Sequence, residues 1–306
     1  MNRLSHAAVA GAVVLALLGA AAPANASLPV SERGSGCFTP DTGAAARGGD
    51  GSVQDTRGIS STEQDAIEAQ TDAILAAKGS SAKTTTTNVP VYIHVMLDSL
   101  GNGDVTQKQI DDQMAVLNND FAGGESRSAA DTGFRFTLMG VDRYYNDQWH
   151  LDKNSPSYRR ETRQGGANAL NIWLVDFAYL GIATFPWDYA TSNGTDGIRV
   201  YWGSLPGGPE RNYNEGDTVV HEAGHWFGLY HTFQGGCKKD GDEVDDTPAQ
   251  SIATRGCPEG QDSCVDLPGL DPIHNYMDYS YDSCYTEFTP LQGSRMNDMW
   301  RAYRTS

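Results

Sequence analysis

The sequence predicts an α/β fold that is followed by an irregular, cysteine-rich region. Between residues 89 and 231, apolar runs typical of strands alternate with segments whose apolar residues recur at helical spacing. Residues 232–306 are rich in loop-forming residues and hold four of the five cysteines. With 306 residues, 39% of them hydrophobic, the chain can form one large domain or two small ones.

Residues 1–26 are typical of a secretory signal peptide. A positively charged start precedes an apolar run at 7–22, and residues 24–26 (Ala-Asn-Ala) have the pattern of a signal-peptidase site. A membrane anchor is the alternative, but the run is rich in alanine and the cleavage pattern follows directly. No later segment is apolar enough to span a bilayer. We therefore expect a secreted protein that has no membrane contact after cleavage.

The charge of the chain argues against one class of partner. The formal net charge is −17 and the sequence pI is about 4.6. Such a surface repels a nucleic-acid backbone, and no stripe of lysine and arginine offsets it. We expect no nucleic-acid partner, and we expect the secreted form to be a monomer.

Residues 27–88 have a composition unlike that of the remainder. They are rich in Gly, Ala, Ser, Thr and Asp and hold too few large apolar side chains to build a core. One amphipathic helix is expected at 61–79, with Ser61 or Thr62 as its cap and Gly79 as its stop. An exposed linker, SSAKTTTT, follows it.

The main domain is expected at residues 89–306. A helix at 106–122 places Ile110, Met114, Leu117 and Phe121 on one face. A second helix begins after Asp217 or Thr218 as cap, and a last one covers about 290–303, with Thr289 as N-cap and Pro290 in its first turn. Strands are expected at 89–97, 134–145, 169–178, 181–186 and 196–203.

The stretch HEAGHWFGLYH, residues 221–231, contains three of the seven histidines. His221 and His225 lie four apart, so both rings can reach one ion from the same helix face. Glu222 lies about 60° round the helix from His225, where it flanks the metal as a general base must. Gly228 can end the helix and turn the chain so that His231 becomes the third ligand. Three protein ligands leave one position open for water, as in catalytic zinc sites.

A single histidine on a helix is usually a structural residue, and His-Glu-x-x-His also recurs on unrelated folds. The extended eleven-residue form is the motif of the metzincin zinc peptidases, which the chain resembles. HNYMDYS at 274–280 supplies the methionine that a metzincin needs downstream. HTFQGGC, GDEVDDTP, NYMDYSYDSC and FTPLQGSRM narrow the resemblance to the pappalysin family, and within it to ulilysin-like secreted microbial members.

The resemblance covers roughly residues 89–301 and implies a metzincin-type fold of two subdomains. The upper subdomain, about 89–231, would hold a twisted mixed sheet and two helices. The lower, about 232–306, would be irregular, with the Met-turn and the C-terminal helix. It implies a zinc endopeptidase in which Glu222 moves the proton of the attacking water. Met277 would be a structural floor beneath the metal.

Several finer assignments follow from the resemblance alone. Tyr279 would bind the metal at rest and then stabilise the oxyanion, although simple packing in the Met-turn is the alternative. The strand at 181–186 would bind substrate along its edge. Asp282 would favour Arg or Lys after the cleaved bond; an exposed loop aspartate is equally consistent with the sequence.

The resemblance also implies how the cysteines pair. Sequence alone allows three pairings of the four clustered cysteines. The resemblance implies Cys237 with Cys264 and Cys257 with Cys284, which would staple the lower subdomain.

GDEVDDTP offers oxygen ligands for a structural calcium ion. The resemblance implies that Asp242, Asp245 and Thr247 would provide them. Without it, an acidic surface turn is the default interpretation.

Cys37 is the odd cysteine. In the family, residues 27–88 correspond to a pro-segment, and a cysteine there can occupy the open position on zinc and keep the precursor latent. Phe38 follows Cys37 where the family often has glycine. A free thiol or an intermolecular disulfide are the alternatives.

The function predicted is a secreted zinc endopeptidase made as a latent precursor, acting on polypeptides and inhibited by its own pro-segment. A zinc hydrolase of non-peptide substrates and a non-enzymatic metal-binding protein are the alternatives. Sequence leaves open the natural substrate, the mature N-terminus and whether activation is autocatalytic.

Overall fold

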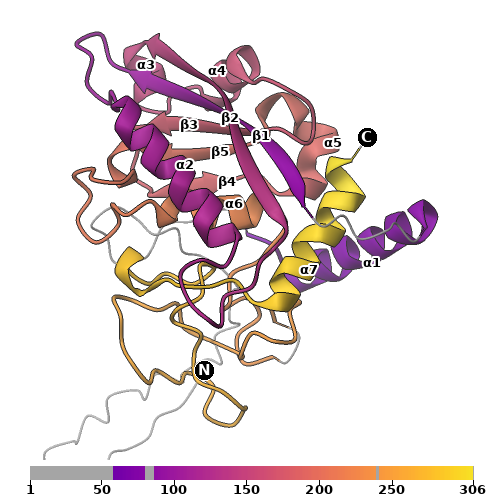
Figure 1. Cartoon of the computed structure of the whole chain (residues 1–306). Helices are drawn as coiled ribbons and strands as arrows, with labels where there is room; N and C mark the ends of the chain where they lie inside the picture. The colour runs from indigo at the N-terminus through magenta and orange to yellow at the C-terminus, as the bar shows by residue number, and fades with distance from the viewer. Residues whose placement is uncertain (1–57, 80–85, 239–240, 306) are drawn as a thin grey trace, which may run out of the picture. The chain divides into compact units, whose positions relative to one another are not determined.

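The computed structural model describes residues 58–79, 86–238 and 241–305 (Figure 1). The expected signal peptide and Cys37 lie outside these residues. Among the helices described, none is long and apolar enough to cross a membrane. By contacts, residues 38–306 form one compact unit, and the description below concerns this unit.

A five-stranded mixed sheet lies at the centre of the upper part, in the order β2-β1-β3-β5-β4. The first four strands in this order are parallel, and only β4 runs antiparallel to its neighbour β5. The short β4 thus forms one edge of the sheet, as expected for 181–186. The strands are β1 (Thr87–Leu97), β2 (Phe134–Tyr145), β3 (Leu170–Val175), β4 (Gly181–Ala183) and β5 (Ile198–Tyr201).

The long β1–β2 pair contains a β-bulge. Val91 pairs with Leu138, but Tyr92 pairs with Gly140, so Met139 is an extra residue in β2. Because of this bulge, the apolar residue Met139 is 57% exposed on the edge strand β2.

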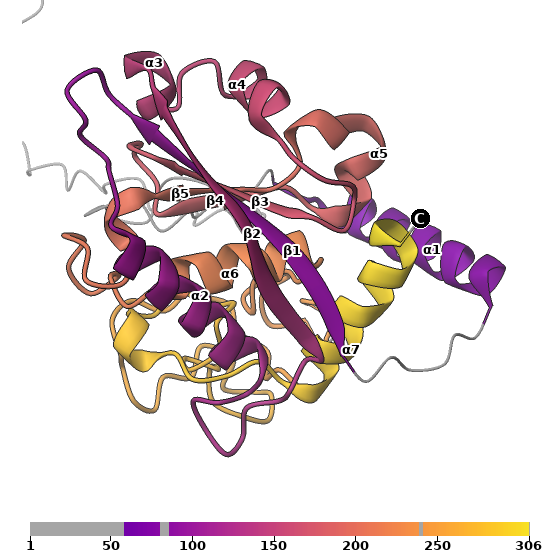
Figure 2. The ribbon, with the colours of Figure 1, turned by 45° about the horizontal axis from the view of Figure 1, so that its top comes forward.

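Helices cover both faces of the sheet (Figure 2). Helices α2 (Gln107–Phe121) and α6 (Asp217–Trp226) pack on one face. The expected face of α2 is confirmed: all four of its predicted core residues are buried. The opposite face carries the short helices α3 (Asp147–His150), α4 (Ser155–Thr162) and α5 (Tyr189–Ser192), which the sequence analysis did not predict.

Two helix starts were placed differently by the sequence analysis. Helix α1 (Ser61–Lys78) is capped by Ser60, whose hydroxyl accepts from the Glu63 backbone N–H at 3.2 Å, and not by Ser61 or Thr62. Helix α6 starts after Gly216 because the N-cap has φ 111°, which favours glycine, so Asp217 is its first residue. Helix α7 (Pro290–Met299) has the expected Thr289 cap, and residues 300–304 continue it as a π-helical turn, so the predicted extent of about 290–303 is confirmed.

The lower part has little regular structure before α7. Two disulfides join Cys237 to Cys264 and Cys257 to Cys284, which are the two pairings that the resemblance implies. Each closes a loop over a sequence separation of 27 residues, and closure of that size stabilises a fold by about 3 kcal/mol in the chain-entropy account. These bonds compensate for the small apolar content of this region.

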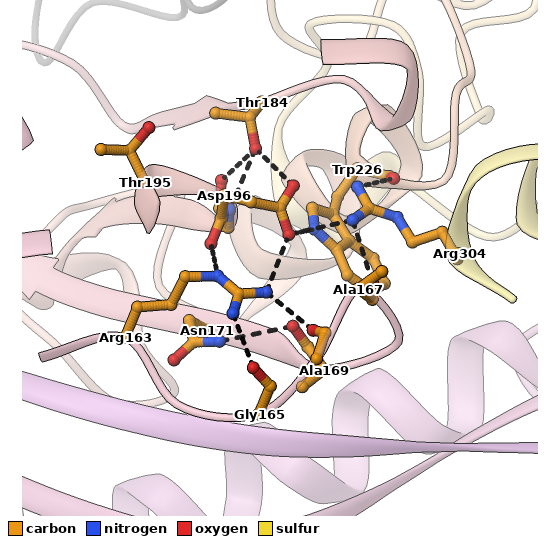
Figure 3. Close-up of polar contacts among 12 residues, drawn as sticks. Arg163, Gly165, Ala167, Ala169, Asn171, Thr184, Thr195, Asp196, Trp226 and Arg304 are labelled. Atoms are coloured by element: carbon orange, nitrogen blue, oxygen red, sulfur yellow. Dashed lines mark hydrogen bonds and ion pairs between the residues drawn. The ribbon is translucent and has the colours of Figure 1, made fainter. Parts of the chain in front are cut away.

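One buried carboxylate joins the end of α6 to the sheet edge and to the C-terminus (Figure 3). Asp196 accepts hydrogen bonds from the Arg304 guanidinium at 2.9 Å, the Trp226 indole at 3.1 Å and the Thr184 hydroxyl at 3.1 Å. Arg163 approaches the same carboxylate at 3.4 Å. The Arg304 guanidinium also lies 3.6 Å from the Trp226 ring centroid. A single charge therefore fixes the C-terminal end of the helix that carries the histidines.

Replacing Asp196 with alanine should lower the free energy of unfolding by about 3–5 kcal/mol, because it leaves two arginines with a buried, uncompensated charge. Urea denaturation of the secreted protein measures this. Asp112→Ala is the matched control: it removes the exposed i,i+4 pair with Lys108 and should cost less than about 1 kcal/mol. Equal losses in the two variants would contradict the assignment.

Candidate active site

Three buried histidines converge beneath β4. His221 and His225 lie one turn apart on α6, and His231 follows the helix after a sharp turn. Their Nε2 atoms are 3.1 Å (His221 to His225), 3.0 Å (His225 to His231) and 3.3 Å (His221 to His231) apart. Within the described part of the chain, they are the one group of three His, Cys, Asp or Glu residues that could hold a metal ion.

The hydrogen bonds of two rings fix which nitrogen faces the centre. The Nδ1 of His221 lies 2.6 Å from the Tyr276 carbonyl oxygen, and that of His225 lies 2.8 Å from the Leu229 carbonyl oxygen. A carbonyl only accepts, so both Nδ1 atoms carry the proton, and in the neutral rings both Nε2 atoms present lone pairs to each other. Two lone pairs at 3.1 Å repel unless a cation lies between them.

The spacing of the three nitrogens fits zinc. Zinc–nitrogen bonds of 2.0–2.1 Å in tetrahedral geometry place ligand nitrogens roughly 3.3 Å apart. The carbonyl partners of His221 and His225 are of the kind that orients metal-binding imidazoles. The residues present therefore suit a zinc ion with three histidine ligands.

Gly228 makes the turn that brings His231 to the site. Its φ is 94°, a conformation that favours glycine. A Cβ atom there would also lie 2.6 Å from Cγ of Met299. The backbone N–H of Leu229 donates to the Gly224 carbonyl at 3.0 Å, which closes the helix end and aims the Leu229 carbonyl at His225.

Met277 lies directly under the helix of the histidines. A Cβ at Gly224 would lie 2.4 Å from the Met277 sulfur, so the glycine inside the motif makes room for this side chain. Met277 is fully buried, and its carbonyl accepts from the Thr232 N–H at 3.2 Å. The Met277 turn and the segment of chain after His231 are thus held together.

The sequence analysis missed the residue that fixes this turn. Asp278 is buried, and its carboxylate accepts from the Thr254 N–H at 2.9 Å, the Gln250 amide at 2.9 Å and the Tyr279 N–H at 2.8 Å. Burial raises the pKa of Asp278 above its usual range. Its partners Thr254 and Gln250 come from a distant loop, so no local pattern in the sequence marks this aspartate as structural.

A small pocket opens beside the histidines. Glu222, 2% exposed, lines it together with His221 and Tyr279. The backbone of β4 passes close above the Glu222 carboxylate: a Cβ at Gly181 would lie 2.3 Å from its Oε1. Gly181 is therefore a site residue that the sequence analysis did not single out, because only the fold brings it against the helix.

The ring of Tyr279 lies beside the histidines. Its centroid is 4.8 Å from that of His231 and 5.6 Å from that of His221. Phe233 stacks on His231 at 4.6 Å, with an angle of 9° between the planes, and its own ring meets that of Tyr279 edge-on, with centroids 5.0 Å apart. His231, Phe233 and Tyr279 thus form one cluster of mutually contacting rings, which restrains the third histidine.

Asp282 lies in the wall of the same pocket and is 3% exposed, unlike a surface loop aspartate. Its Oδ2 accepts from the backbone N–H of Glu215 at 2.8 Å and of Gly216 at 3.2 Å. Its Oδ1 has no hydrogen-bond partner among the described residues. Burial raises the pKa of Asp282 to about 7. Asp217 lines the pocket as well, and burial, then Asp282 and Asp120, raise its pKa above the usual range.

The acidic turn at 242–247 is partly buried. Asp242 is 6% exposed and accepts from the Thr247 hydroxyl at 2.7 Å and the Val244 N–H at 3.2 Å, while Asp245 is exposed. Burial raises the pKa of Asp242 to about 7. The two aspartates do not form part of a three-residue His, Cys, Asp or Glu cluster among the described residues.

The sequence of the chain is similar to those of known proteins of one peptidase family. The sequence profile of peptidase family M43, described as pregnancy-associated plasma protein-A, matches residues 176–301. An extracellular metalloprotease of Neurospora crassa is 44% identical over 245 residues, which cover 78% of this chain and 83% of the relative. One of Verticillium alfalfae is 46% identical over 248 residues, which cover 78% and 84%.

Solved structures agree with this family. A point mutant of Tannerella forsythia promirolysin superposes with a TM-score of 0.66 at 26% identity, and the match covers 79% of this chain and 89% of the mutant. Mature mirolysin in complex with a cleaved peptide gives 0.63 at 27% identity, covering 72% and 97%. The predicted mixed-sheet, metzincin-type fold is thereby confirmed, and a metal-binding protein without activity is excluded. The chain belongs to the M43, or pappalysin, family of peptidases and is an extracellular zinc metalloendopeptidase.

Proposed function

We propose that this enzyme hydrolyses polypeptides with Glu222 as general base, prefers Arg or Lys after the cleaved bond, and is secreted as a latent precursor. The observation that supports the chemistry is the Glu222 carboxylate, buried beside the histidines in a pocket that the sheet edge overlies. His221, His225 and His231 would hold the zinc ion.

The chain's own residues account for the proton transfers and the charge. When bound, zinc acidifies water and polarises the scissile carbonyl. Glu222 accepts the proton of the attacking water and delivers it to the leaving amine, for which a buried carboxylate is well suited. Tyr279, which lines the pocket with its ring 4.8 Å from that of His231, would donate its hydroxyl hydrogen to the developing oxyanion. Met277 and Gly228 support the ligands without taking part.

Substrate would bind along β4. This strand lies at the end of the sheet and passes above Glu222. An extended peptide can join such an edge by backbone hydrogen bonds, which places its carbonyl over the pocket. The structure of mature mirolysin with a cleaved peptide supports a polypeptide as the substrate. We propose that the enzyme acts as a monomer.

Asp282 would select the residue after the cleaved bond. Its Oδ1 is buried in the pocket wall without a partner among the described residues, so an incoming cation would find an unsatisfied acceptor. A guanidinium or ammonium group there would form a charge-assisted hydrogen bond.

Cys37 would keep the precursor latent by taking the open position on zinc. The odd number of cysteines supports this, because the other four are paired with each other. The solved promirolysin structure, which is of a relative's precursor form, supports a pro-segment in this chain.

Calcium would bind at the turn of Asp242, Asp245 and Thr247, since this turn brings carboxylate, hydroxyl and carbonyl oxygens together.

Addition of calcium to chelator-stripped, zinc-reloaded enzyme should raise its melting temperature. No shift, or the same shift in Asp242→Asn, would refute the site.

The Glu222→Gln variant tests the proposed chemistry. It should lower cleavage of casein by a factor of at least about 10²–10⁴, because the amide cannot accept the proton. Zinc content, measured by mass spectrometry of the intact protein under native conditions, should remain at the parent level. Glu161→Gln, an exposed glutamate at the end of α4, is the control and should keep full activity. Activity of Glu222→Gln close to that of the parent would exclude this residue as the base.

The Asp282→Asn variant tests the proposed preference for Arg or Lys after the cleaved bond. Against matched peptides with Arg or Leu after the cleaved bond, the Arg-to-Leu ratio of kcat/KM should fall roughly 10- to 100-fold, the loss of one charged hydrogen bond. Glu125→Gln, an acidic residue outside this pocket, should leave the ratio unchanged.

The same ratio should depend on pH in the parent enzyme. The pKa of Asp282 is raised to about 7 by burial, and Glu215, Asp217, Tyr213 and Tyr285 surround it without a compensating cation among them. An aspartate with a raised pKa is neutral below that value and charged above it. The Arg-to-Leu ratio should therefore increase from pH 6 to pH 8, and a flat profile would remove Asp282 from the pocket's chemistry.

The Cys37→Ala precursor tests latency. The unprocessed variant should cleave substrate before any N-terminal cleavage, whereas the parent and a Ser35→Ala control should stay inactive. In the parent, Cys37 should resist alkylation until zinc is removed. Equal latency of variant and parent, with Cys37 freely alkylated, would overturn this proposal.

A further inference from the structure

Helix α1 belongs to the segment 27–88 that the sequence analysis assigned to the pro-segment. It nevertheless packs against α7 and against the residues next to the third histidine. Figures 1 and 2 both show α1 beside α7. We infer that α1 is a permanent part of the peptidase, that Glu68 and Arg295 are positioning residues for the turn of the third histidine, and that the segment removed on maturation ends before Ile59.

A chain of three groups links α1 to this turn. Glu68 of α1 accepts two hydrogen bonds from the guanidinium of Arg295 on α7, at 2.6 and 2.9 Å. The Nε of Arg295 donates to the Gly228 carbonyl at 2.9 Å. Gly228 is the residue whose positive φ carries the chain from His225 to His231. One guanidinium therefore connects a carboxylate of α1 to the backbone between two metal ligands.

Arg295 also holds the residue before the third histidine. Its guanidinium lies 4.9 Å from the ring centroid of Tyr230, and the Tyr230 hydroxyl donates to Glu68 at 3.3 Å. Arg295 is 8% exposed, so without Glu68 this buried cation would lose the one carboxylate that forms an ion pair with it among the described residues, and Glu243 and Asp242 would be left to act on it through space. Loss of α1 would thus remove the carboxylate that orients Arg295, the residue that hydrogen-bonds the turn.

Apolar packing links α1 to the site as well. Ile59 and Ile67 are 3% and 6% exposed, and they form a buried cluster with Phe185 and Tyr230. Phe185 meets the His225 ring edge-on, with centroids 5.6 Å apart. Removal of α1 would expose apolar side chains of this cluster, which packs against a metal ligand.

Polar contacts engage both ends of α1. Near its start, Gln64 donates to the Gly241 carbonyl at 3.0 Å and accepts from Gln234 at 3.2 Å. Near its end, Lys78 donates to the Arg301 carbonyl at 2.7 Å, and Arg301 donates to the Gly79 carbonyl at 2.8 Å. An inhibitory segment that leaves on activation is not expected to supply so many partners to the rest of the fold.

The processing part of this inference rests on the proposed latency, and N-terminal sequencing of the active secreted enzyme separates the two. A terminus between Cys37 and Ile59 is expected and supports both. A terminus beyond Gly79, with α1 absent from the purified enzyme, would overturn the inference. A terminus at about Ser27 would overturn removal of a pro-segment while supporting retention of α1.

Zinc affinity tests the positioning role apart from activity. Arg295→Met and Glu68→Gln should weaken zinc binding by about 10- to 100-fold in competition with a chelator, as loss of an outer contact to metal ligands does. Arg301→Met is the matched control: it removes a contact to the end of α1 but none to the Gly228 turn, so its zinc affinity should equal that of the parent.

The comparison is made at a temperature where circular dichroism shows each variant folded. If Arg295→Met fails to fold, the zinc affinity of Glu68→Gln decides the positioning role, because this variant removes only the charge of Arg295's partner. Parent-like zinc affinity in Glu68→Gln, or a loss of equal size in Arg301→Met, would overturn the positioning role.

Discussion

Two imidazole nitrogens with lone pairs turned toward each other lie 3.1 Å apart in a buried site, and this arrangement is stable only around a cation. Such a site has to be prepared by the rest of the chain. The Tyr276 and Leu229 carbonyls fix the tautomers of His221 and His225, and the Gly228 turn delivers the third ring. Metal binding therefore contributes to the stability of the fold as well as to the chemistry.

The elements that hold this arrangement come from every part of the described chain. Met277 lies beneath α6, and the buried Asp278 holds the Met277 turn to a loop that the Cys237–Cys264 disulfide closes. At the far end of α6, Asp196 ties Trp226 to the sheet edge and to Arg304 (Figure 3). The helix is thus fixed from below by Met277 and at its C-terminal end by Asp196.

Charge is distributed unevenly around the site. Two buried arginines contact the elements that hold the histidines, and both have partners. Arg295 pairs with Glu68 and donates to the Gly228 carbonyl, and Arg304 pairs with Asp196. The pocket wall instead carries Asp217 and Asp282, whose pKa values burial raises. Burial of like charges without a cation is unfavourable, and carboxylates with strongly shifted pKa values cluster at functional sites.

The sequence alone predicted that His221, His225 and His231 meet at one point, because helical spacing and a glycine turn specify this locally. It also predicted the strands and the long helices, because apolar periodicity specifies them. It also indicated the secretory start. Only the tertiary structure showed that Gly181 lies against Glu222, that Asp282 is buried rather than exposed, and that Asp278 and Asp196 are structural carboxylates. The same is true of α1, whose composition suggested a segment outside the core. Its role depends on Glu68 meeting Arg295, 227 positions away, and local sequence carries no signal for contacts between residues so far apart.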